Sequence, residues 1–158
     1  MSLIGYRGYD FENRKWIYSN TIKWSDAVDC LFMMKEDCEW QRVSNVGICS
    51  REWARNNQEI YEGDILKENY NPHDTSQYGV VKRDVGSIKI YLEWHYLKKF
   101  EGEWIEIVNK TEIYHSRDYK VVGNEYENLE EVRKEFLERK EKLEHESKLL
   151  IDNRKDEI

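Results

Sequence analysis

The chain has 158 residues, of which 36% are charged, and its formal net charge at pH 7 is -7. A chain of this length suits one ordinary domain with a small appendage, and it can bury enough surface to fold without a metal ion or a disulfide. The aromatic content of 13% argues against disorder. The pI near 5.2 argues against generic nucleic-acid binding, which needs clustered Lys and Arg.

Two features of the whole sequence predict a cytoplasmic protein. The longest apolar runs cover only a few residues, and the N-terminus "MSLIGYRGYD" has no basic region followed by a long apolar run. Cys30, Cys38 and Cys49 are odd in number and lack a CxxC spacing, so we expect reduced thiols.

Residues 1–57 are predicted to form an N-terminal β-rich segment. The stretches "IGYRGYD", "KWIYS", "VDCLFMM" and "EWQRV" alternate or are rich in apolar and aromatic residues, as is typical of strands. Ser25 and Asp26 are residue types that cap helices, so a short helix could begin there. A helical turn could form over residues 50–57.

Residues 58–128 are predicted to form a small β-barrel. Its strands are expected in "DILKENY", "YGVVKRD", "SIKIYLEWHYL" and "KFEGEWIEIV". Hairpin turns are expected at Gly86 and at Glu101-Gly102, because glycine supplies the positive φ that such turns need.

The stretch Glu62-Gly63-Asp64 lies between two apolar β pairs and raises two interpretations. Gly63 tolerates a positive φ, and Asp64 can hydrogen-bond its own backbone, so a tight bend at a barrel corner is one interpretation. Acid–base chemistry by Glu62 and Asp64 is the other. We favour the bend, because no His, Ser or Cys is close to the two carboxylates in sequence.

Residues 129–158 are predicted to form a charged amphipathic helix. Asn128 is a good N-cap, and Glu131 lies where the second half of a capping box belongs. Most apolar residues share one face: Leu129, Val132, Phe136, Leu143 and Leu150. The first half should dock on the body of the protein. The second half has fewer apolar residues, so it projects, contacts another subunit or frays.

Four short phrases carry a resemblance to a known family. They are "YRGYD" (6–10), "IYEGDI" (60–65), "GVV" (79–81) and "VVGNEYEN" (121–128). In this order they resemble the YopX family of bacteriophage and prophage proteins, over about residues 4–128. Two departures are visible. The approach to the second phrase reads "VGICSREWARNNQ" where the family often has a Gly- and Lys-rich turn, and Leu129 stands where the family commonly has Pro.

The resemblance implies a β-rich fold with an SH3-like barrel in its C-terminal part, a tendency to self-associate and no established activity. The predicted fold class is therefore α+β, mostly β. It comprises the N-terminal β segment, an SH3-like, partly open β-barrel and the C-terminal helix.

Aromatic residues of the predicted barrel could line a ligand groove, as they do where SH3-like barrels bind peptides. These residues are Tyr91, Trp94, Tyr96 and Trp104. Aromatic residues at strand spacing are more often part of the core, and the sequence leaves both interpretations open. Arg7 is expected to stack on aromatic rings or to pair with a buried carboxylate such as Asp10.

No catalytic, cofactor-binding or metal-binding residues are predicted. The four histidines have long, irregular spacings that match no metal-binding pattern: His73, His95, His115 and His145. Cys49 with a distant His could form a nucleophile pair, but nothing in its local sequence supports this.

The predicted function is that of a non-enzymatic phage or prophage accessory protein in the cytoplasm of a bacterial host. It would act through protein–protein contacts, as a homo-oligomer, with a phage or host protein as a further partner. The alternative is a nucleic-acid-associated factor in phage replication or regulation, which a basic stripe on the folded barrel would favour. A third hypothesis is a small enzyme, which a cleft with converging carboxylates or His would favour.

Overall fold

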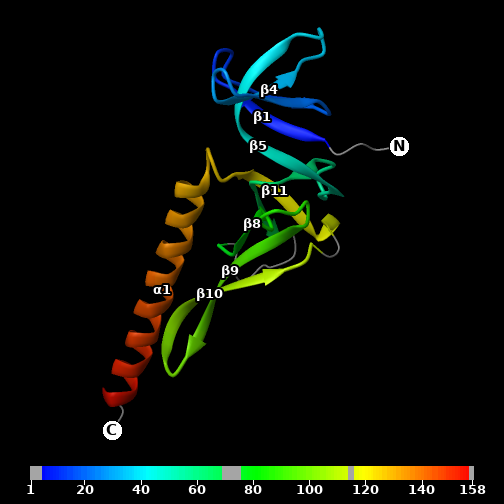
Figure 1. The fold of residues 1–158 in the computed structure, drawn as a ribbon. Helices are drawn as coiled ribbons and strands as arrows, with labels where there is room; N and C mark the ends of the chain where they lie inside the picture. The colour runs from blue at the N-terminus through cyan, green and yellow to red at the C-terminus, as the bar shows by residue number, and fades with distance from the viewer. Residues whose placement is uncertain (1–4, 69–75, 114–115, 157–158) are drawn as a thin grey trace.

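The computed structural model describes residues 5–68, 76–113 and 116–156. In this part of the chain there are eleven strands, one long helix and one short 3-10 turn (Figure 1). The strands are β1 (Tyr6–Asp10), β2 (Lys15–Ser19), β3 (Ile22–Ser25), β4 (Cys30–Met34), β5 (Trp40–Trp53), β6 (Glu59–Tyr61), β7 (Asp64–Glu68), β8 (Tyr78–Arg83), β9 (Ile90–Phe100), β10 (Glu103–Thr111) and β11 (Tyr119–Asn124). The 3-10 turn is η1 (Ser116–Asp118), and the helix is α1 (Leu129–Asp156). The predicted mostly-β α+β class is confirmed.

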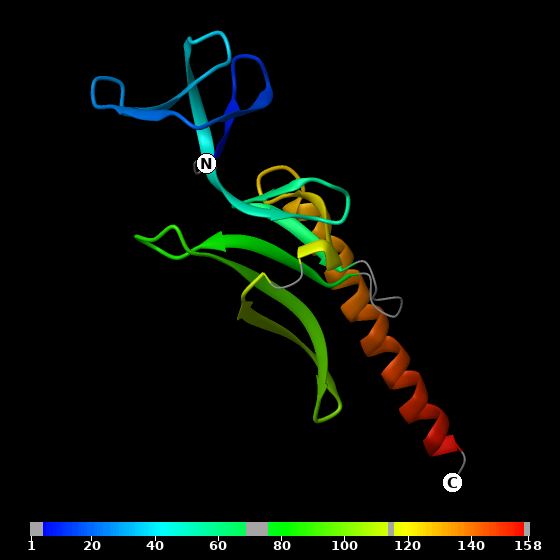
Figure 2. The ribbon, with the colours of Figure 1, turned by 90° about the vertical axis from the view of Figure 1, so that its right-hand side faces the viewer.

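The first sheet contains β1 to β6 and is antiparallel throughout, in the order β2-β1-β5-β4-β3. Its centre is the 14-residue β5, which pairs with β4 near its start, with β1 in its middle and with β6 near its end. Residues from 58 onward were predicted to belong to the second segment, but β6 pairs with β5 of this first sheet. Figure 2 shows β1 to β4 standing apart from α1.

The second sheet has the antiparallel order β10-β9-β8-β7-β11 and is open, because its edge strands β10 and β11 do not pair with each other. The predicted hairpin turns are present, with φ of +74° at Gly86 and +82° at Gly102. Each face of this sheet carries a buried apolar cluster. The first comprises Ile65, Tyr78, Val80, Leu97, Val132 and Phe136, and the second comprises Ala54, Ile60, Leu66, Val81 and Leu92.

The helix α1 runs along one face of the second sheet, where Val132 and Phe136 enter the first cluster (Figure 1). Docking continues further along α1 than predicted. Leu143 packs against the same cluster, and the indole Nε1 of Trp104 donates to Ser147 Oγ at 3.2 Å. Of its apolar residues, Leu137 and the last three, 149–151, are exposed. No stretch of α1 is long and apolar enough to cross a membrane.

Three local predictions need correction or refinement. Residues 26–29, where a short helix could begin, form a turn between β3 and β4. Residues 50–53 continue β5 instead of forming a helical turn. Asn128 precedes α1 as predicted, but its side-chain oxygen accepts the backbone N–H of Asn124 at 3.1 Å, so it fixes the loop before the helix.

Candidate functional site

The two sheets are joined by a buried ion pair between Arg7 of β1 and Asp64 of β7, whose side chains are 5% and 1% exposed. Arg7 Nη2 also donates to the backbone oxygen of Glu62 at 3.2 Å. The guanidinium lies over the rings of Trp16 and Tyr61, at 4.8 and 5.1 Å from their centroids. Arg7 is therefore the stacked and paired structural residue that the sequence predicted.

The carboxylate partner of Arg7 differs from the predicted one. Asp10, which was the example given, closes the turn after β1. Its Oδ1 accepts the N–H groups of Glu12 and Asn13 at 3.0 and 3.2 Å, and its Oδ2 accepts the side-chain amide of Asn13 at 2.7 Å. Asp10 lies three positions after Arg7 and so projects from the opposite face of β1.

The predicted bend at Gly63 is present, with φ of +92°. Asp64 Oδ2 accepts the backbone N–H of Tyr61 at 2.8 Å, which closes the turn. The N–H of Gly63 donates to the Val81 oxygen at 2.8 Å, and the Gly63 oxygen accepts the N–H of Glu125 at 2.7 Å. The bend thus connects the first sheet to the second and is fixed by β8 and by the loop before α1.

The last of the four phrases folds around two asparagines. Asn124 Oδ1 accepts the N–H groups of Tyr126 and Glu127, both at 3.0 Å. The backbone N–H of Asn124 in turn donates to Asn128 Oδ1. Trp16 of β2 donates its indole N–H to Glu127 Oε1 at 2.8 Å, so this loop is also tied to the first sheet.

All four phrases that carry the family resemblance meet at this junction. Arg7 comes from the first phrase and Asp64 from the second, and the bend between them bonds to Val81 of the third and Glu125 of the fourth. We call this set of residues the junction. The junction links all four phrases, because each one supplies a bond that another phrase completes.

The two carboxylates of the junction, Glu62 and Asp64, each form an ion pair with an arginine. Glu62 Oε1 lies 3.1 Å from Arg83 Nε, while its buried Oε2 has no hydrogen-bond partner among the described residues. Burial raises the pKa of Glu62 against the opposing charge of Arg83. Burial likewise raises the pKa of Asp64 against the charge of Arg7. Glu62 and Asp64 thus bond to different arginines, Arg83 and Arg7.

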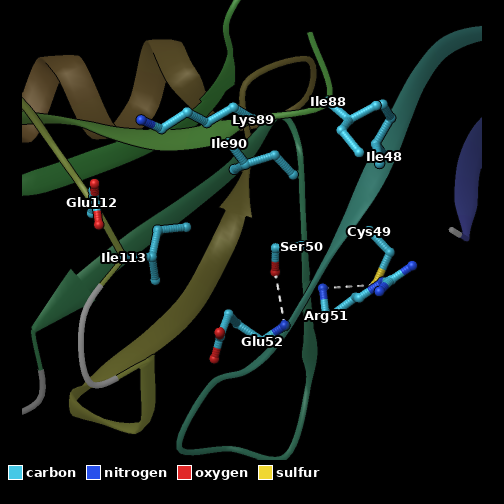
Figure 3. A pocket seen from close by; sticks show the side chains of 10 residues that line it. All are labelled: Ile48, Cys49, Ser50, Arg51, Glu52, Ile88, Lys89, Ile90, Glu112 and Ile113. Carbon is cyan, nitrogen blue, oxygen red and sulfur yellow. Dashed lines mark hydrogen bonds between the residues drawn. The ribbon is translucent and has the colours of Figure 1, made fainter. Parts of the chain in front are cut away.

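A separate pocket of about 390 Å³ opens beside the end of β5, next to the β8–β9 turn and the residues after β10 (Figure 3). It is lined by Ile48, Cys49, Ser50, Arg51, Glu52, Ile88, Lys89, Ile90, Glu112 and Ile113. Its size suits a small ligand. The lining combines four isoleucines with two cations and two carboxylates. Because these charges balance, the pocket favours neither an anionic nor a cationic ligand.

The pocket also offers no activated nucleophile. Cys49 Sγ accepts the N–H of Arg51 at 3.4 Å, and Ser50 Oγ accepts the N–H of Glu52 at 3.1 Å (Figure 3). Burial raises the pKa of the Cys49 thiol, which disfavours the reactive thiolate. The hypothesis of a Cys49 nucleophile therefore gains no support from its surroundings.

The four aromatic residues proposed for a groove do not share one face of the second sheet. Trp104 packs with the first cluster under α1, whereas Trp94 packs with the second cluster on the other face. Side chains alternate along β9, so Tyr96 shares the face of Trp94, and Tyr91 shares the face of Trp104. The two tryptophans belong to the margins of the core, and no single groove uses all four residues.

A polar network under α1 was not predicted. His95 Nδ1 lies 2.8 Å from Glu106 Oε1, and His95 Nε2 lies 3.0 Å from Glu93 Oε1. From α1, Arg133 donates to Glu106 Oε2 at 3.1 Å and to the Tyr78 hydroxyl at 2.9 Å. The Tyr78 ring stacks on the imidazole with 4.6 Å between centroids.

The residue types of this network are those of acid–base chemistry, but their bonds dock the helix. The hydrogen bond from Arg133 lowers the pKa of Glu106, which keeps this carboxyl ionised as the helix partner. The i,i+2 spacing of Glu93 and His95 on a strand could have predicted a shared face. Nothing local could have placed Glu106 and Arg133 beside them.

The remaining histidines give no metal site in the described structure. His73 and His115 lie outside the described residues, and His145 is exposed on α1. Within residues 5–68, 76–113 and 116–156, no three His, Cys, Asp or Glu side chains are grouped so that they could hold a metal ion.

Comparison with known proteins identified no related family or protein. No protein-family model matches the chain, and no curated protein matches it.

Proposed function

We propose that this chain is a non-enzymatic phage or prophage accessory protein that acts through protein–protein contacts in the cytoplasm of a bacterial host, and that it forms homo-oligomers. One observation carries the proposal. Large apolar side chains are exposed on the first sheet and at the end of α1: Phe11, Tyr18, Trp24, Val28, Trp40, Leu149, Leu150 and Ile151. Contiguous exposed apolar patches usually mark contacts with other proteins. Phe11 and Trp24 line one groove, and residues 149–151 are consecutive at the end of α1.

Two findings support the family resemblance and the SH3-like fold. The four phrases converge on the junction, which is expected if they belong to one conserved structural unit. In the second sheet the hairpin-connected strands β7 to β10 are followed by the 3-10 turn η1, and β11 then returns to pair with β7. This order of strands is the one found in small SH3-like barrels.

The nucleic-acid alternative is less well supported. Several cations of the second sheet are paired with carboxylates, as in Lys82–Glu125, Arg83–Glu62 and Lys110–Asp84. Paired cations give a mixed surface, whereas phosphate binding needs a stripe of free Lys and Arg.

Self-association is expected to depend on the end of α1. Truncation after Lys148 should leave the docked part of the helix intact and lower the average mass measured by light scattering. Truncation after Glu141 is less suitable, because it also removes Leu143 and Ser147, which contact the second sheet. Three apolar side chains cover less than the roughly 800 Å² per partner of a standard interface, so the association should be weak and concentration-dependent.

The matched variants are substitutions that keep the helix at full length. Serine at Leu149, Leu150 and Ile151 should lower the mass as the truncation does. Serine at Leu137, which is also exposed on α1, should leave the mass unchanged. A mass that is the same for the full chain and for the truncated chain at every concentration would remove the end of α1 from the interface.

A further inference from the structure

A groove of about 540 Å³ crosses the first sheet where β1 ends and where β3 turns into β4. Its lining residues are Phe11, Glu12, Trp24, Asp29, Cys30, Leu31, Arg42, Val43 and Ser44. Phe11 and Trp24 are 64% and 54% exposed, which is unusual for aromatic side chains in an apolar setting. Within the described residues, neither α1 nor the second sheet covers this part of the chain (Figures 1 and 2).

Both aromatic rings are held in position by contacts within the chain itself. Phe11 packs edge-on against Tyr9, with 5.0 Å between ring centroids and 84° between planes. The indole N–H of Trp24 donates to Asp26 Oδ1 at 2.9 Å. Side chains that are already ordered lose little conformational freedom on binding, so the groove is prepared for a ligand.

Several other aromatic rings of the first sheet are covered by the chain's own cations. Arg7 lies over Trp16 and Tyr61, and Lys23 lies 4.1 Å from the Trp40 centroid. Among the described residues no lysine or arginine takes that position over Phe11 or Trp24. The exposed faces of these two rings are therefore open to a cation from outside.

The polar groups of the groove also favour a cation. Neither Glu12 nor Asp29 has an ion-pair partner in the described part of the chain, and Glu12 Oε2 is positioned by the side-chain amide of Gln41 at 3.2 Å. Ser44 Oγ is buried and lacks a hydrogen-bond partner among the described residues. Arg42 partly offsets the two negative charges.

We propose that this groove binds an arginine side chain presented by a segment of another protein. A guanidinium is planar, so it can stack on an aromatic face while its N–H groups bond to carboxylates, which a lysine ammonium cannot do in the same way. The residues flanking the arginine would lie along the groove. The proposal deepens the proposed function, because it specifies the chemistry of one protein contact.

The test is an NMR titration of the isotope-labelled full chain with acetyl-Gly-Gly-Arg-Gly-Gly-amide. The indole N–H of Trp24 and the backbone amides of Asp29 and Ser44 should shift in a saturable way. The same peptide with citrulline, the neutral isostere of arginine, should bind about fivefold more weakly or not at all. The lysine peptide should bind more weakly than the arginine peptide. Equal binding of the citrulline peptide would overturn the proposal.

Single substitutions distinguish binding in the groove from nonspecific binding elsewhere on the surface. Glu12→Gln should weaken the arginine peptide, and Arg42→Met should strengthen it, because each changes only the charge near the site. Trp24→Ser should abolish the shifts. Trp53→Ser is the matched control, since Trp53 is 44% exposed but does not line the groove. Binding that survives both Trp24→Ser and Phe11→Ser would overturn the assignment of the site.

The source of the cation is tested by acetyl-arginine amide, which has the side chain without the flanking backbone. The pentapeptide should bind more tightly, because its flanking residues add contacts along the groove. Equal affinity for the two probes would show a site for small cations and would contradict a protein segment as the ligand. These outcomes leave the self-association measurement unaffected, so a failure here is distinct from a failure of the proposed function.

Discussion

Replacing Arg7 by methionine should lower the free energy of unfolding by about 3–5 kcal/mol, which is the usual cost of removing one partner of a buried ion pair. The substitution leaves Asp64 buried, with the backbone N–H of Tyr61 as its remaining hydrogen-bond donor. It also removes the guanidinium that lies between the rings of Trp16 and Tyr61. Urea unfolding followed by circular dichroism measures the loss.

The loss should depend on pH in a defined direction. Burial raises the pKa of Asp64 and Arg7 opposes that effect, so without Arg7 the folded-state pKa rises further. A carboxyl whose pKa is raised on folding stabilises the protein at pH values below that pKa, and the contribution is lost as the pH rises through it. Arg7→Met should therefore be less damaging at about pH 5 than at about pH 8.

The double variant Arg7→Met/Asp64→Leu is the control, because it removes both charges and keeps apolar volume at the site. It should regain much of the stability that the single variant loses. If the double variant is as unstable as Arg7→Met at both pH values, the unpaired Asp64 carboxylate is not the cause of the loss.

Gly63→Val is expected to destabilise the protein by about 2–4 kcal/mol, from backbone strain together with overpacking. The φ of +92° at Gly63 is one that a β-branched residue rarely adopts. A Cβ at this position would lie 3.1 Å from the Tyr126 ring, so the loop before α1 must also shift. Thermal melts of Gly63→Val and Gly86→Val provide the comparison.

Gly86 also has a positive φ, but a Cβ there meets no atom within 4 Å. Gly86→Val should therefore show the backbone strain without the steric contact, and its loss should be the smaller one. Equal melting temperatures for Gly63→Val and the unchanged chain would mean that the bend at Gly63 is not required by the fold.

Local patterns were enough to predict the bend at Gly63, the hairpin turns and the start of α1. Each of these depends on the conformational preference of one or two residues, such as the positive φ of Gly63. The structural role of Arg7 was also predictable from its aromatic surroundings. Its partner was not, because Asp64 lies 57 residues away and only tertiary structure selects it over Asp10.

Non-local packing explains the other differences. The sequence of β6 gives no sign that it pairs with β5 instead of joining the second sheet. Docking of α1 extends to Ser147 because Trp104, on a distant strand, reaches the helix. An aromatic groove was considered only in the second sheet, whereas the exposed aromatic pair, Phe11 and Trp24, lies on the first. Burial of an aromatic residue depends on which layers cover its sheet, and the sequence pattern does not specify them.

The central claim, that this protein works by binding other proteins, is tested most directly by capture followed by reconstitution. The tagged full chain is expressed in a bacterial host that carries the related phage or prophage, and the proteins recovered with it are identified, purified and titrated against the purified chain. The account predicts at least one protein that binds the purified chain reversibly and at defined stoichiometry. If no recovered protein binds the purified chain, and the chain alone stays monomeric at every concentration, the account is contradicted.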